Sequence, residues 1–299
     1  MKTKFFLTAI AAAFVMTTAA AQTTLQLNLQ KGENYYQTNK LNSQVTMSIS
    51  GMSMAVTTTI DQKHVFKVIN IDGDNYDFEV KYEKFSMSTS MPQMSVSFSS
   101  ENPKDVISSA LAEMTKHSFN VKMNKFGEIL EISNFDKLMD AAFSQNSSIS
   151  EMEKQQIKQF LDEDQIKNSL ETMTAIYPKT AVSQGDNWNK ENVTNSGGIS
   201  ISIATKYALS ESNGNSNKVS GTMIIKSDPN ATPIYDPSMG GSVKYKLSGT
   251  GTAEITLDAK SGWIIDATIK QNIKGDLEMI EAGMVVPISI NNTSSLSNK

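Results

Sequence analysis

Hydrophobic and polar residues alternate along the first and last thirds of the chain. Leu25, Leu27 and Leu29 begin a series of such runs that extends to about residue 99, and similar runs return between about 199 and 290. A period of two residues is typical of strands with one buried face. The apolar positions change parity after Gly51, which predicts a turn, and Asp72-Gly73 predicts a hairpin. Both thirds are therefore predicted to form antiparallel strands.

Pro92 interrupts one run, which predicts an edge strand near it. A further stretch, 228–241, is rich in Pro and Gly and is predicted to be an irregular loop. The residues after Ile290 are polar, and we predict that 291–299 form a flexible tail.

The middle third has apolar residues at helical spacing. Asn102-Pro103 and Asn134 predict two helix starts, and Ser150 with Glu153 forms a capping box before a third. Pro178 is predicted to end the helical region. Because apolar helix stripes need a sheet to cover them, we predict an α+β fold. It would be one long, curved antiparallel sheet, which could form a half-barrel, with helices from 103 to 177 packed on one face; two β domains joined near Pro178 are the alternative.

The first 21 residues have the composition of an export signal. A basic start is followed by an apolar run from Phe5 to Met16 and by the small residues Ala19, Ala20 and Ala21. This pattern predicts a signal peptide, 1–21, cleaved after Ala21, and thus a periplasmic or secreted protein. The mature part, 22–290, is predicted to be one domain without an integral membrane segment.

The composition argues against several classes of function. The chain has no Cys, no Arg and two His residues, and its net charge is −4. Thiol nucleophiles and Cys-based metal sites are therefore excluded, and nucleic-acid binding is disfavoured. No nucleophile motif is present. We predict that the protein is not an enzyme and uses no cofactor; a hydrolase working through two carboxylates is the remaining catalytic alternative.

Four stretches together resemble an uncharacterised family of exported, β-rich proteins of Bacteroidota. They are Lys-Gly-Glu-Asn-Tyr-Tyr at 31–36, the segment 119–132, Val-Ser-Gln-Gly-Asp-Asn-Trp at 182–188, and 249–275. The resemblance implies no activity. The layout is also similar to the LolA and LolB lipoprotein carriers, which implies a curved sheet whose concave side can hold an acyl chain. The arginine associated with lipid handling in LolA has no counterpart here.

Methionines crowd the first β block. Core packing is the first interpretation of these residues, a plastic surface for a lipid-like ligand is the second, and a Cu(I) site is the third. We predict an exported protein that binds an apolar or amphiphilic ligand; the alternative is a structural or interaction module of the cell envelope. The candidate ligand-binding residues are Met47, Met52, Met54, Met87, Met94, Phe143, Phe160, Leu170, Met173 and Trp188.

Overall fold

The computed structural model describes residues 22–49, 51–144, 149–160, 163–196, 199–236 and 240–299. Within them, 13 strands form one antiparallel sheet. In chain order the strands are β1 (Asn34–Ile49), β2 (Met52–Asp72), β3 (Asn75–Met91), β4 (Met94–Ser99), β5 (Ser118–Asn124), β6 (Ile129–Ser133), β7 (Asn187–Ser196), β8 (Ile199–Ser212), β9 (Ser216–Ser227), β10 (Ile234–Asp236), β11 (Gly241–Asp258), β12 (Ile264–Met279) and β13 (Met284–Ser297).

The strands follow the spatial order β6-β5-β3-β2-β1-β13-β12-β11-β9-β8-β7, with β4 beside β3 and β10 beside β11. Pairing between β1 and β13 joins the first and last β blocks, so both belong to the same sheet. Because β6 and β7 end the order without pairing with each other, the sheet is open. The predicted long antiparallel sheet is confirmed.

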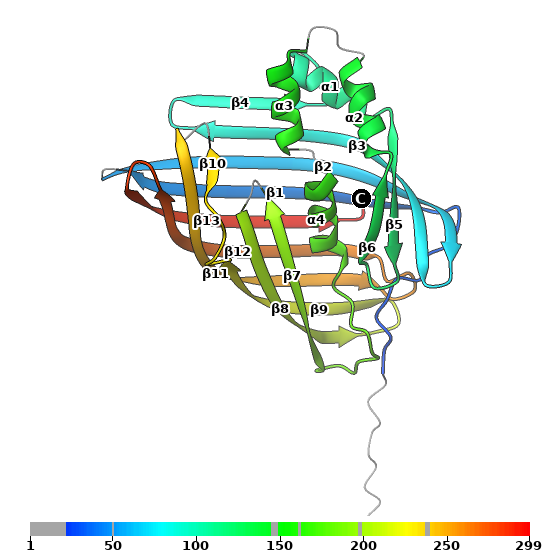
Figure 1. Ribbon diagram of the computed structural model, residues 1–299. Helices are drawn as coiled ribbons and strands as arrows, with labels where there is room; N and C mark the ends of the chain where they lie inside the picture. The colour runs from blue at the N-terminus through cyan, green and yellow to red at the C-terminus, as the bar shows by residue number, and fades with distance from the viewer. Residues whose placement is uncertain (1–21, 50, 145–148, 161–162, 197–198, 237–239) are drawn as a thin grey trace, which may run out of the picture.

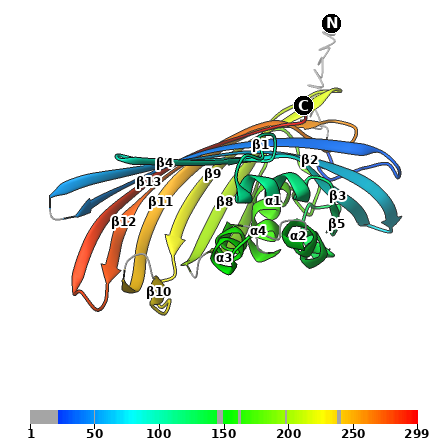
Figure 2. The same cartoon turned by 90° about the horizontal axis from the view of Figure 1, so that it is seen from above.

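The helices of the described residues occupy the concave side of the arched sheet, as Figure 2 shows. They are α1 (Val106–Met114), α2 (Phe135–Ser144), α3 (Glu151–Phe160) and α4 (Glu163–Thr174). Figure 1 shows α1, α2 and α3 grouped at one side of the arch and α4 between β6 and β7. Phe135 of α2 packs edge-on against Phe119 of β5, with ring centroids 5.5 Å apart. The prediction of helices on one face is confirmed.

The predicted turns lie where glycine permits a left-handed backbone. Gly51 separates β1 from β2 with φ 81°, and Gly73 separates β2 from β3 with φ 55°. Ser150 and Glu153 also form the predicted capping box, since the Ser150 N–H donates to Glu153 Oε2 at 2.8 Å and the Glu153 N–H donates to Ser150 Oγ at 3.2 Å. Local sequence signals thus fix these boundaries.

The first predicted strand is wrong. Leu25, Leu27 and Leu29 are buried, but they lie in an extended segment outside the sheet. The Leu27 N–H donates to the Lys125 carbonyl and the Asn28 N–H to the Ser261 carbonyl, at 2.8 Å each. This segment therefore crosses the turns at one end of the sheet, and its alternation reflects burial there instead of strand pairing.

The predicted tail, 291–299, is also wrong up to Ser297. These residues belong to β13, a central strand hydrogen-bonded to β1 on one side and β12 on the other. Their polar side chains concealed a strand because the pairing uses backbone groups and Leu296 alone supplies a large buried anchor. Within the predicted loop 228–241, residues 234–236 form β10, and 237–239 lie outside the described residues.

Two helix ends also differ from the prediction. The first helix begins at Val106, because the Asp105 carboxylate caps it by accepting from the Ser108 N–H at 2.8 Å. Asn102-Pro103 precedes this cap. At the other end, α4 stops at Thr174, four residues before Pro178.

Candidate functional site

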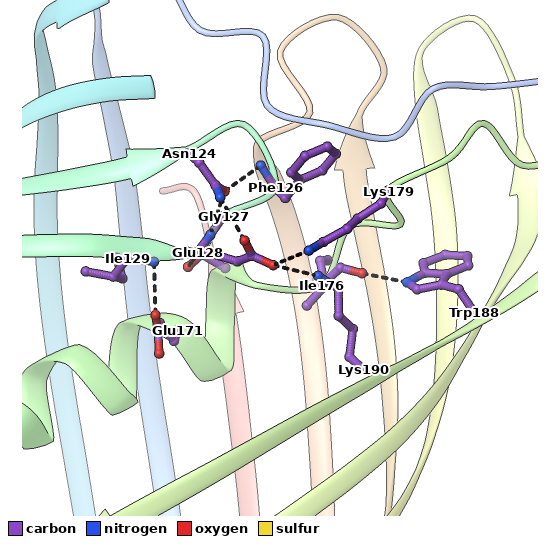
Figure 3. Close-up of polar contacts among 11 residues, drawn as sticks. Asn124, Phe126, Gly127, Glu128, Ile129, Glu171, Ile176, Lys179, Trp188 and Lys190 are labelled. Atoms are coloured by element: carbon purple, nitrogen blue, oxygen red, sulfur yellow. Dashed lines mark hydrogen bonds and ion pairs between the residues drawn. The ribbon is translucent and has the colours of Figure 1, made fainter. Parts of the chain in front are cut away.

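Helix α4 spans the gap between the two ends of the open sheet. It lies against both β6 and β7. Glu171 Oε1 accepts a hydrogen bond from the backbone N–H of Ile129, at 3.0 Å, on the edge strand β6 (Figure 3). An edge strand presents unpaired backbone donors, and the helix satisfies one of them. Helix α4 therefore takes the place of further strand pairing.

A polar network fixes the turn between β5 and β6 beside α4 (Figure 3). Asn124 Nδ2 donates to Glu128 Oε2 at 2.7 Å, and the ammonium groups of Lys190 and Lys179 lie 3.3 and 3.9 Å from Glu128 Oε1. Burial alone would raise the pKa of Glu128, but the Asn124 hydrogen bond and the two cations outweigh it and lower that pKa. Glu128 is thus held as a carboxylate that links β6 to β7.

Gly127 brings this turn into contact with the end of α4. Its φ is 76°, and a Cβ added there would lie 1.9 Å from the Thr174 carbonyl oxygen. The Thr174 hydroxyl donates to the Gly127 carbonyl at 2.6 Å. Close backbone approach and a left-handed conformation both require glycine at this position.

Trp188 fastens β7 to the chain that follows α4. Its indole Nε1 donates to the Ile176 carbonyl at 2.8 Å (Figure 3), and its ring stacks on Tyr207 with centroids 5.8 Å apart. The side chain is half-buried. We call the region where α4 lies between the edge strands β6 and β7 the seam. Trp188 therefore helps to hold the seam together.

Two cavities lie between α4 and the concave face of the sheet. The smaller has a volume of about 170 Å³, and its lining includes Glu171, Lys190, Tyr207 and Met223. The larger has about 290 Å³ and extends over β1, β13 and β12. Thr172 and Gln271 line both cavities. We call the two together the α4 cleft. The larger cavity is lined by Asn39, Leu41, Asn168, Ser169, Thr172, Met173, Thr194, Ile269, Gln271, Asn292 and Ser294.

A third hollow, of about 450 Å³, lies on the opposite face. Its lining includes Lys40 paired with Asp61, and Asn42 paired with Thr59. These positions alternate with Leu41, which faces the α4 cleft, so their side chains point to the convex side. This hollow is a trough between two polar rows and is separate from the cleft.

The predicted ligand-binding residues do not gather in one place. Met173 lines the α4 cleft, Leu170 is a buried residue of α4, and Trp188 lies at the seam. Met47 and Met54 face each other across β1 and β2 on the concave face. Phe143 is half-buried with the Lys158 ammonium 5.9 Å from its ring centroid.

The remaining three methionines lie elsewhere. Met52 and Met94 are 73% and 54% exposed beside hairpin turns. Met87 pairs with Ile60 on β2 and Phe98 on β4 and is half-buried. The side chain of Phe160 lies outside the described residues.

The sequence did not lead us to predict that polar side chains line the cleft. Gln271 interrupts the apolar run formed by Ile269 and Ile273 on β12, and all three share the concave parity. A polar residue at a position predicted to face the core was an available signal. The approach of Thr172 to the same place depends on tertiary packing and left no such signal.

No described helix has the length and apolar character needed to span a bilayer. Likewise, the described part of the chain holds no cluster of three or more His, Asp or Glu side chains suited to a metal ion.

Comparison with known proteins identifies a family and a fold. Residues 73–264 match the family of unknown function DUF6263. No curated protein gives a significant match to the sequence. Lipovitellin, in a structure devoted to its lipid–protein interactions, is similar with a TM-score of 0.50 and 11% identity, covering 91% of this chain and 25% of that chain. This chain thus spans about a quarter of lipovitellin, and the likeness concerns the fold alone.

A second solved structure, described as an outer membrane lipoprotein-sorting domain from Vibrio parahaemolyticus, gives a TM-score of 0.14 and 6% identity. It covers 85% of this chain and 83% of that chain. A score this low does not support a shared fold. The predicted membership of an uncharacterised family is confirmed by the DUF6263 match, and the similarity to LolA and LolB stays a prediction.

Proposed function

The chain belongs to the family of unknown function DUF6263, and we propose that it is an exported protein that binds an amphiphilic, lipid-like ligand in the α4 cleft. The export part rests on the sequence of residues 1–21, which lie outside the described residues. Mass spectrometry of the mature protein tests it, because cleavage after Ala21 leaves Gln22 as the first residue.

The observation that carries the binding proposal is the mixed lining of the cleft. Leu41, Met173 and Ile269 offer apolar surface beside the amides of Asn39 and Asn292. Pockets that combine apolar walls with a few polar groups are typical ligand sites. An acyl chain placed there gains about 0.8 kcal/mol for each CH₂ removed from water.

The edges of the cleft also suit entry of a long ligand. Helix α4 lines the cleft and lies against both β6 and β7, where it is held by side-chain contacts such as Glu171 to Ile129. Lipovitellin, whose structure concerns lipid–protein interactions, shares the fold at low identity. That likeness is compatible with lipid binding, and the proposal rests on the cleft.

We also propose binding in place of catalysis. Glu128, Glu171 and Glu191 are the carboxylates that line the cleft, and Glu191 Oε1 accepts a hydrogen bond from the Ser202 hydroxyl at 3.2 Å. Glu128 is paired with two lysines, and Glu171 accepts from a backbone N–H. A hydrolytic pair needs one carboxyl with a raised pKa, whereas the pKa of Glu128 is lowered.

Native mass spectrometry of protein purified without delipidation tests the proposal directly. We expect adducts with the mass of an acyl lipid, and saturable uptake of a pyrene-labelled fatty acid or fatty alcohol by delipidated protein. Protein that carries no adduct and takes up neither probe would contradict it.

A second candidate function is favoured by the distribution of charge. Residues 41–60, 85–100 and 282–298 contain no Asp, Glu, Lys or His. They occupy parts of the neighbouring strands β13, β1, β2, β3 and β4, and they expose Met52 and Met94. A charge-free surface with exposed apolar side chains is typical of an interaction site. An interaction module of the cell envelope is therefore the alternative.

Site-specific cross-linking tests this alternative, because the chain has no Cys. A photo-crosslinker attached at Met94→Cys should capture a protein in intact cells. The matched control is Ile224→Cys, a similarly exposed position on another strand, at 57% against 54%. Equal capture from the two positions would argue against an interaction site at β4.

A further inference from the structure

Three polar side chains lie side by side in the buried concave face. Gln37 on β1 pairs with His64 on β2, which pairs with Tyr82 on β3. Their exposed fractions are 1%, 2% and 1%. Among the described residues, Gln37 Oε1, His64 Nδ1 and the Tyr82 hydroxyl have no hydrogen-bond partner. We call these three residues the polar row.

The polar row departs from its surroundings. The adjacent row on the same face includes Phe66, paired with Val80 on β3, and both are fully buried. Buried polar groups in folded proteins almost always have partners, because leaving one unpaired is costly. Cross-strand neighbours have Cβ atoms about 5 Å apart, so one small polar group can contact more than one member of the row.

One end of the polar row, Gln37, adjoins the α4 cleft, although none of the three residues lines the two cavities described above. Asn39, which lines the larger cavity, is two residues from Gln37 on the same face of β1. Two residues along a strand span about 7 Å. Asn292 lines the same cavity, and its Oδ1 is also buried without a partner in the described part of the chain. An unpartnered polar atom thus occurs in the cavity, and the polar row begins with Gln37 directly beyond it and continues across β2 and β3.

The chemistry of these residues selects a neutral ligand group. None of the described residues that line the larger cavity is charged. Burial lowers the pKa of His64 to about 4 and raises the pKa of Tyr82, so both side chains are neutral near pH 7. A carboxylate or phosphate would lose its hydration without gaining a cation. A hydroxyl can donate to an amide oxygen and accept from a phenol.

We propose that the larger cavity and the polar row bind the uncharged, hydroxyl-bearing head group of an amphiphile such as a monoacylglycerol. This inference rests on the proposed function, and it narrows the ligand from any amphiphile to one with an uncharged head group. The apolar side chains of the cleft, Met173 and Ile269 among them, then contact the first part of the acyl chain.

The test compares two lipids with the same acyl chain, monooleoylglycerol and oleate, by calorimetric titration of delipidated protein at pH 7. We expect the wild type to bind monooleoylglycerol at least tenfold more tightly than oleate. Equal or tighter binding of oleate would overturn the neutral head group. Binding of neither lipid would contradict the proposed function itself, so the two failures are distinct.

Two tyrosine variants separate a ligand contact from a structural role. Tyr82→Phe removes an unpartnered hydroxyl, and Tyr76→Phe removes one that donates to the Leu27 carbonyl at 3.0 Å. Both tyrosines face the concave side of β3 and are buried. We expect Tyr82→Phe to weaken monooleoylglycerol binding at least fivefold with no loss of thermal stability. Tyr76→Phe should lower the melting temperature and leave the affinity unchanged.

The triple variant Gln37→Leu, His64→Phe, Tyr82→Phe replaces the whole polar row by apolar groups. We expect at least a tenfold loss of monooleoylglycerol affinity with a smaller effect on oleate. Unchanged affinity in a folded triple variant would overturn the inference and assign the row to buried water. Should the triple variant not fold, the same decision falls to Tyr82→Phe, for which unchanged monooleoylglycerol affinity overturns the inference.

Discussion

Glu171 on α4 accepts a hydrogen bond from the backbone N–H of Ile129 on β6, with 3.0 Å between Oε1 and N. This contact ties the helix to one edge strand of an open sheet, while the same helix also lies against β7, the other edge strand. The seam between the sheet edges is therefore closed by side chains, and its stability should depend on a few identifiable contacts.

Removing the Glu171 carboxylate should loosen this seam. We expect Glu171→Ala to lower the free energy of unfolding by about 1–2 kcal/mol, because a backbone donor loses its charged acceptor. Glu171→Gln keeps an acceptor oxygen and should lose less than half of that. Urea unfolding measures both variants, with Glu163→Ala at the exposed start of α4 as the control, expected within about 0.5 kcal/mol of wild type. Equal losses in all three variants would contradict a specific role.

Gly127 should be the least replaceable turn glycine of the seam. Gly127→Ala places a Cβ 1.9 Å from the Thr174 carbonyl oxygen at a left-handed φ. Gly32→Ala meets the same backbone strain, at φ 88°, with nothing within 4 Å. Gly32→Ala, the control, should therefore lower the free energy of unfolding by about 1–2 kcal/mol. Gly127→Ala should lower it clearly more. Thermal unfolding of the two variants checks the difference, and equal costs would show that α4 moves aside easily.

Burial of His64 should make the protein lose stability in acid, at pH values above those at which carboxylates usually titrate. Its pKa falls from 6.5 to about 4 on folding because burial opposes the charged form. The unfolded chain then binds the proton more readily, so stability is intact above pH 6.5 and decreases as the pH falls towards 4. The slope is about 1.4 kcal/mol per pH unit, and the total roughly 3 kcal/mol.

The variant His64→Phe removes this titration. Its free energy of unfolding, measured by urea between pH 7 and 5, should stay nearly flat while that of the wild type declines. A wild-type slope that persists in the variant would assign the acid sensitivity to other groups.

Short-range features were predictable from the sequence. The hairpin at Asp72-Gly73 and the capping box of Ser150 and Glu153 each depend on residues close together in the chain, and the structure contains both. The segment from Leu25 to Leu29 was wrongly predicted to be a strand, because alternation of apolar and polar residues indicates burial of alternate side chains and not strand pairing. Here the leucines are buried in a segment that contacts turns distant in sequence. The tail misled for the opposite reason, since residues 291–297 pair through backbone groups while most of their side chains are polar.

The candidate site was less predictable than the fold. Helical spacing placed Met173 on an apolar stripe, and it does line the cleft. The methionine-rich strands suggested one ligand surface, yet Met52 and Met94 lie exposed beside hairpin turns. Which strands face α4 depends on the pairing of β1 with β13, and these two strands are separated by most of the chain. No local pattern encodes that neighbourhood.

Filling the α4 cleft is the most direct test of ligand binding there. Thr172 lines both cavities, so Thr172→Trp should occupy the space, whereas Glu163→Trp adds the same side chain at an exposed position of the same helix. Titration of delipidated protein with monooleoylglycerol measures the effect. We predict at least a tenfold loss of affinity for Thr172→Trp and wild-type affinity for Glu163→Trp. A folded Thr172→Trp variant that binds the lipid as tightly as the wild type would contradict binding in the cleft.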